Sequence, residues 1–99
     1  MKSLAACAQA LLAAYYNDSQ SAYAYAAFVN SFFALAYAQL AASTHSANDW
    51  YAAYLYANAA QGYAYQEYLN TGSLYSYYAF AYGYNGSLFA LRAYQDEKV

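Results

Sequence analysis

Charged residues are scarce in this sequence, and proline and isoleucine are absent altogether. Only 8% of the 99 residues are charged, against about 25% in an average globular domain. Between Ser19 and Leu91 the only formal charges are Asp49 and Glu67. The chain has three basic residues and a net charge of −2, so it lacks the Lys/Arg patch that binds phosphates. We therefore expect no nucleic-acid partner.

Cysteine and histidine are almost as rare, with one residue of each. The single cysteine excludes an internal disulfide and leaves the cellular compartment open; a chain expressed in soluble form would be cytoplasmic. A metal site needs several converging His, Cys or carboxylate ligands, which the scattered acids do not supply. Glycine-rich phosphate loops and nucleophile elbows are also missing. We expect no cofactor, no metal, no small-molecule ligand and no enzymatic activity.

A few residues could nevertheless carry chemistry, and each has a simpler interpretation. Ser43 or Ser46, His45 and Asp49 contain the side chains of a catalytic triad, but near neighbours in one turn do not point at a common substrate. We interpret them as a solvated loop and a helix cap. Cys7 suits a packed thiol on an alanine-rich helix face, and Glu67 suits an exposed residue that keeps a helix soluble. No catalytic, cofactor-binding or metal-binding residue is predicted.

Alanine and tyrosine together make up more than 40 of the residues, and alanine is the strongest helix former. The longest uncharged stretch of helical periodicity runs from Ser21 to Ala42 and is apolar on nearly every face, which is typical of a helix surrounded by others or by lipid. It predicts a central helix over about residues 20–43. We expect the core to contain Phe28, Phe32 and Leu35, packed against Leu11, Leu55 and Leu88 or the neighbours of these leucines.

Polar caps and glycines interrupt the helical pattern near residues 17–19, 43–48, 71–73 and 85–87. The chain is therefore expected to form one all-α domain over residues 1–99, a compact bundle of four to five helices. An alternative stays open for the C-terminal part. Asn85-Gly86 suits a type I′ turn and the flanking tyrosines favour strands, so a β-hairpin around Asn85-Gly86 would also fit.

Three classes of function remain open. The first, which we favour, is a structural or self-associating helical bundle without catalytic activity, because the 17 tyrosines offer contact area with a polar tip and mark no single pocket. The repetition of alanine and tyrosine in this sequence resembles that of a computationally designed chain, which need not have an evolved function. The second is a membrane-associated protein that spans with residues 22–42. The third is a protein-binding module with a tyrosine-rich face. The motifs resemble no known family closely.

Overall fold

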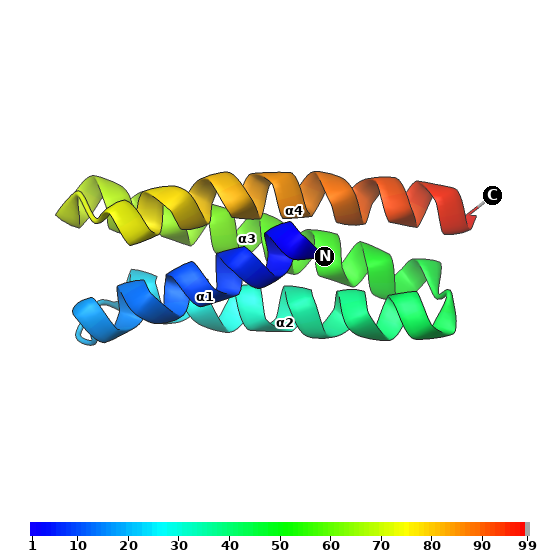
Figure 1. The fold of residues 1–99 in the computed structure, drawn as a ribbon, viewed down its shortest axis with the longest axis horizontal. Coiled ribbons are helices and arrows are strands. Elements are labelled where there is room, and N and C mark those ends of the chain that lie inside the picture. The colour runs from blue at the N-terminus through cyan, green and yellow to red at the C-terminus, as the bar shows by residue number, and fades with distance from the viewer. Residues whose placement is uncertain (99) are drawn as a thin grey trace.

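A computed structural model describes residues 1–98 as four helices: α1 (Lys2–Asn17), α2 (Ala22–Thr44), α3 (Ala47–Thr71) and α4 (Leu74–Lys98). They form an elongated bundle of 42 × 18 × 16 Å. Figure 1 shows that α1 is the shortest helix and that its N-terminus lies near the middle of the bundle's length. No strand occurs within residues 1–98. The prediction of an all-α bundle is confirmed, and the alternative of a C-terminal hairpin is wrong.

Three of the four predicted breaks are real because local residues cap the helix ends, through serine side chains at two helix starts and through the backbone of a glycine at one helix end. Ser21 accepts a hydrogen bond from the Ala24 N–H at 3.1 Å, and Ser46 accepts one from the Asp49 N–H at 3.3 Å. Each hydroxyl thereby satisfies one of the backbone donors left free at a helix start. At the end of α3, Gly72 adopts the left-handed conformation (φ 70°) that glycine tolerates best. The predicted helix over about residues 20–43 corresponds to α2.

The fourth predicted break, at residues 85–87, is wrong, since α4 continues through it without interruption. Gly86 faces α1, and a Cβ atom added there would lie 2.6 Å from Leu4 Cδ2. Gly83 also lies at a close contact, where a Cβ would approach Gln61 Cβ at 3.1 Å. In this helix glycine therefore allows close packing and does not form a turn.

The interior of the bundle is built from small side chains at alternating three- and four-residue spacing, which keeps one seam of a helix facing its neighbours. The seam of α2 consists of Ala24, Ala27, Ser31, Ala34, Ala38 and Ala41. The seam of α3 consists of Trp50, Ala53, Ala57, Ala60, Ala64 and Glu67, and α4 contributes Ser76, Ala79, Gly83, Gly86, Ser87 and Ala90. Small side chains let helix backbones approach each other closely.

The predicted core is consequently wrong in its main members. Phe32 is 57% exposed, and Leu55 and Leu88 are 48% and 46% exposed. Phe28 and Leu35 are half-buried at the margin of the core clusters. Of the six residues predicted to pack together, only Leu11 is fully buried. Alanines form most of the inner seam of α2, so the larger side chains of this helix lie on its outer side. The helix is therefore not surrounded by other helices on all sides.

Candidate functional site

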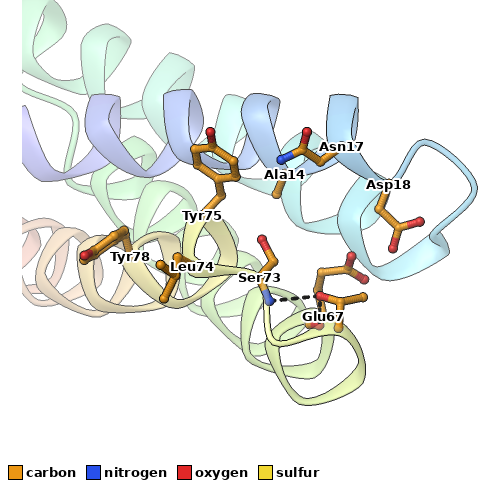
Figure 2. A pocket seen from close by; sticks show the side chains of 9 residues that line it. Ala14, Asn17, Asp18, Glu67, Ser73, Leu74, Tyr75 and Tyr78 are labelled. Atoms are coloured by element: carbon orange, nitrogen blue, oxygen red, sulfur yellow. Dashed lines mark hydrogen bonds between the residues drawn. The ribbon is translucent and has the colours of Figure 1, made fainter.

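A pocket of about 710 Å³ opens at the end of the bundle where α1 and α3 end and α4 begins. Figure 2 shows Asp18 and Glu67 toward one side of it, and Tyr75 and Tyr78 toward the other. The remaining lining residues are Ala14, Asn17, Thr71, Ser73 and Leu74. Sites for small molecules commonly measure about 300–1,000 Å³ and combine apolar walls with a few polar groups. This pocket matches that description.

Glu67 is the deepest polar group of the pocket, with only 1% of its surface exposed. The Ser21 hydroxyl donates a 2.5 Å hydrogen bond to Glu67 Oε1, while Ser21 Oγ itself accepts a hydrogen bond from the Ala24 N–H. The cap of α2 therefore fixes the carboxyl group in place. Glu67 Oε2 is also buried and has no hydrogen-bond partner among the described residues. A buried polar atom without a partner carries a desolvation cost of about 1–3 kcal/mol.

The pKa of Glu67 is raised above the ordinary carboxyl value, mainly because burial disfavours the charged form. The Ser21 hydrogen bond offsets part of this effect. The neighbouring Asp18 carboxyl raises the pKa of Glu67 further, because a negative charge beside it disfavours a second one. The two acids thus form an interacting pair at the pocket.

No basic side chain compensates this pair. Arg92 lies about 27 Å along α4 from Leu74, and Lys2 lies about 24 Å along α1 from Asp18, at a rise of about 1.5 Å per residue. Within residues 1–98 the one contact that becomes an ion pair, when His45 is protonated, joins His45 to Glu97 at the opposite end of the bundle. The pocket therefore holds two neighbouring acids and no basic side chain.

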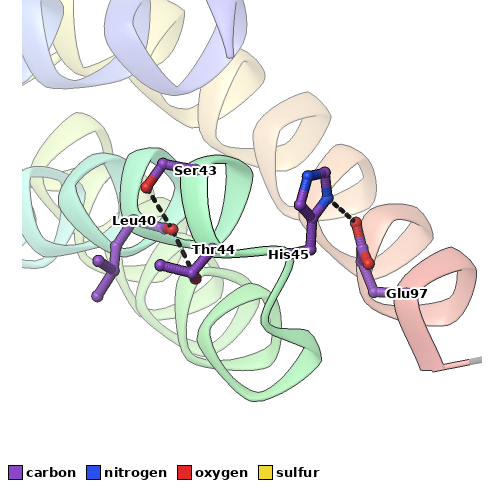
Figure 3. Close-up of polar contacts among 5 residues, drawn as sticks. All are labelled: Leu40, Ser43, Thr44, His45 and Glu97. Carbon is purple, nitrogen blue, oxygen red and sulfur yellow. Dashed lines mark hydrogen bonds and ion pairs between the residues drawn. The ribbon is translucent and has the colours of Figure 1, made fainter.

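The residues that resembled a catalytic triad are not brought together. Figure 3 shows the His45 ring directed toward Glu97, with 3.2 Å between Nδ1 and Oε1. Ser43 donates its hydroxyl proton to the Leu40 carbonyl, and Ser46 caps α3. These contacts agree with the interpretation of this segment as a solvated loop and a helix cap.

Cys7 is buried in the bundle interior, where its thiol donates to the Ala79 carbonyl oxygen at 3.3 Å. Burial raises the pKa of the Cys7 thiol to about 12. A nucleophilic cysteine needs a lowered pKa and solvent access. Cys7 therefore acts as a packed thiol, as the sequence indicated.

A second feature is a run of neighbouring aromatic rings along the outside of α2. Tyr15 lies 5.7 Å from Tyr25 and 6.4 Å from Phe28, measured between ring centroids. The run continues to Phe32, Phe33 and Tyr56, with successive separations of 6.5, 6.3 and 5.4 Å. We call this surface the aromatic face of α2; it consists of Tyr25, Phe28, Phe32 and Phe33 of α2, flanked by Tyr15 of α1 and Tyr56 of α3. Within residues 1–98, α2 is also the one helix long and apolar enough to cross a membrane.

No family model, curated protein or solved structure matches this chain. Its site is therefore defined by its own geometry. Sequence reasoning missed the pocket because it treated Glu67 as an exposed residue. The signal that could have found it is the spacing of the α3 seam, in which Glu67 follows Ala60 and Ala64 at helical intervals.

Proposed function

We propose that this protein is a structural protein without catalytic activity, which associates with copies of itself through the aromatic face of α2. The observation that carries the proposal is the outward position of large apolar side chains on this uncharged helix. Phe32 and Phe33 are 57% and 43% exposed, whereas Ala27 and Ala34 are fully buried. A contiguous apolar patch of this kind usually marks an interface.

A second copy is the occupant that this surface fits best. Residues 20–44 carry no formal charge, so two such faces meet without electrostatic repulsion and without burying an unpaired ion. Three phenylalanines give the face its apolar centre, and tyrosine hydroxyls stay solvated at its margin. A two-fold dimer places the same patch on both partners and closes the assembly.

Sedimentation velocity from micromolar to millimolar concentration, in buffer without detergent, tests this proposal. We expect the mass of the unsubstituted chain to rise above the monomer value. The double variant Tyr25→Glu, Phe32→Glu should remain monomeric with an unchanged helical circular dichroism spectrum. A control with the same added charge, Tyr82→Glu, Tyr84→Glu on α4, should still associate. A constant monomer mass for the unsubstituted chain would contradict the proposal.

A membrane-associated protein is the second candidate, favoured by the composition of α2. Its mean hydropathy reaches 1.3 over an 18-residue window, and only 28% of that window is buried within the bundle. The flotation of the protein with phosphatidylcholine vesicles separates the two candidates. Flotation that Phe32→Glu abolishes would favour the membrane role, whereas association without flotation would favour the structural role.

The same proposal includes a designed origin for the chain. Its alanine and tyrosine repetition, its lack of proline and its short connections suit an idealised bundle.

A further inference from the structure

We infer that the pocket between α1, α3 and α4 binds a small organic ammonium ion, with Glu67 and Asp18 as its counter-ions and Tyr75 and Tyr78 beside its apolar body. This ligand site is separate from the surface proposed for self-association. It also departs from the sequence-based expectation that the chain has no small-molecule ligand.

The first argument comes from the unpaired oxygen. Glu67 is 1% exposed, lines the pocket, and leaves Oε2 buried without a hydrogen-bond donor. A buried carboxylate is stabilised when it is paired with a cation and hydrogen-bonded. The protein supplies no cation at this end, since Lys2, Arg92 and Lys98 all lie elsewhere along the helices. An ammonium group would supply both the charge and the missing N–H donors.

The second argument comes from the opposite wall. Tyr75 and Tyr78 lie across the pocket from the two acids, and Leu74 and Ala14 complete an apolar lining. Phenol rings attract cations and also pack against aromatic or aliphatic groups. A molecule with an ammonium group at one end and an apolar body at the other therefore matches both walls of the pocket.

A bare metal ion fits less well. Within residues 1–98 no group of three or more His, Cys, Asp or Glu side chains is placed to hold one. Ca²⁺ takes six to eight oxygen ligands at about 2.3–2.6 Å, and the Ser21 hydroxyl already donates its proton to Glu67. The apolar walls and the volume of about 710 Å³ also exceed what an ion needs.

Isothermal titration calorimetry with phenethylammonium as the probe tests the site at neutral pH. We expect saturable binding with one molecule per chain, and no binding of the neutral analogue 2-phenylethanol. Glu67→Gln keeps the size of the side chain and removes its charge, so affinity should fall at least tenfold. Asp18→Asn, at the half-buried rim of the pocket, should also weaken binding. This variant tests the site if Glu67→Gln does not fold. Asp49→Asn, at the start of α3, is the matched control and should bind as the unsubstituted chain does.

Four results would overturn the inference, and the first three concern the probe, its neutral analogue and the acidic-residue variants. These are the absence of saturable phenethylammonium binding, equal binding of 2-phenylethanol, and unchanged affinity in both Glu67→Gln and Asp18→Asn. Displacement of the probe by Ca²⁺ at a comparable concentration would also reject an organic ammonium site in favour of a metal site. Each variant is checked by circular dichroism, so that loss of binding is distinguished from loss of the fold.

Discussion

Glu67 occupies a position on the α3 seam where the preceding residues are alanines and Trp50. A carboxyl group at such a place is stabilised in its neutral form, because burial penalises the charge. The folded protein therefore holds this proton more tightly than the unfolded chain does. Stability at this end of the bundle depends on pH through one residue and its neighbour Asp18.

The direction in which stability changes with pH follows from the difference in proton binding between the folded and unfolded chains. An acid with a raised pKa in the folded state lowers stability as pH rises, beginning at its unfolded pKa of 4.5 and continuing through the folded value. Urea denaturation from about pH 4.5 to about pH 8 should show this fall. Glu67→Gln should flatten the curve and raise stability at neutral pH. The exposed control Asp96→Asn should keep the slope of the unsubstituted chain, and an equally steep fall in Glu67→Gln would reject this assignment.

Two glycines in helices differ in what surrounds them. A Cβ at Gly86 would meet Leu4, whereas nothing lies within 4 Å of a Cβ at Gly62. Gly86→Ala should therefore destabilise the protein by about 1–3 kcal/mol through overpacking. Gly62→Ala should stabilise it by about 0.5–1 kcal/mol, because alanine favours the helix. Thermal unfolding of both variants checks this, and equal shifts of the same sign would disagree with the close contact between α1 and α4.

At the scale of the element, α2 has two stripes that both follow helical periodicity. The inner stripe contains alanines and Ser31, and the outer stripe contains phenylalanine, tyrosine and leucine. Burial of small residues brings the helices closer together and leaves the large side chains outside. The exposed stripe of α2 is therefore the helix surface available to a partner.

This arrangement predicts unequal effects of substitutions on the two stripes. Phe32→Ala in the monomer should cost less than about 1 kcal/mol, since an exposed side chain leaves no cavity. Ala34→Leu should cost about 1–3 kcal/mol or more, because the fully buried seam has no room for it. Chemical denaturation at low protein concentration measures both. A loss of about 3–5 kcal/mol for Phe32→Ala would instead place that ring in the core.

The sequence allowed the helix boundaries at Ser46 and Gly72 to be predicted because they depend on local chemistry. The start of α2 was placed slightly too early, since its N-cap is Ser21 and not a residue of the break predicted at 17–19. The sequence did not allow the inward face of α2 to be predicted. Without charges to mark the solvent side, both stripes are apolar, and the usual preference for burying large side chains selected the wrong one. Gly86 was misread because its close contact with Leu4 depends on a helix distant in sequence. Glu67 was misread because surface exposure was assumed for a charged residue.

At the scale of the whole molecule, the acidic side chains lie toward the two ends of the bundle. Asp18 and Glu67 lie at one end, while His45 and Glu97 pair at the other. The middle of the molecule is covered by tyrosine, phenylalanine and leucine side chains. A molecule of this kind presents little repulsion to a second copy along its length, which is the basis of the proposed self-association.

Disulfide cross-linking through Phe32→Cys tests the self-association most directly, because Phe32 lies next to the midpoint of α2 on its aromatic face. Cys7 does not interfere, since its thiol is buried and its pKa is raised to about 12. Tyr84→Cys on α4 provides an equally exposed control, as Tyr84 is 51% accessible. Under mild oxidation we expect Phe32→Cys to form a covalent dimer and Tyr84→Cys to stay mainly monomeric. Equal yields from the two variants, or a higher yield from Tyr84→Cys, would contradict an interface on α2.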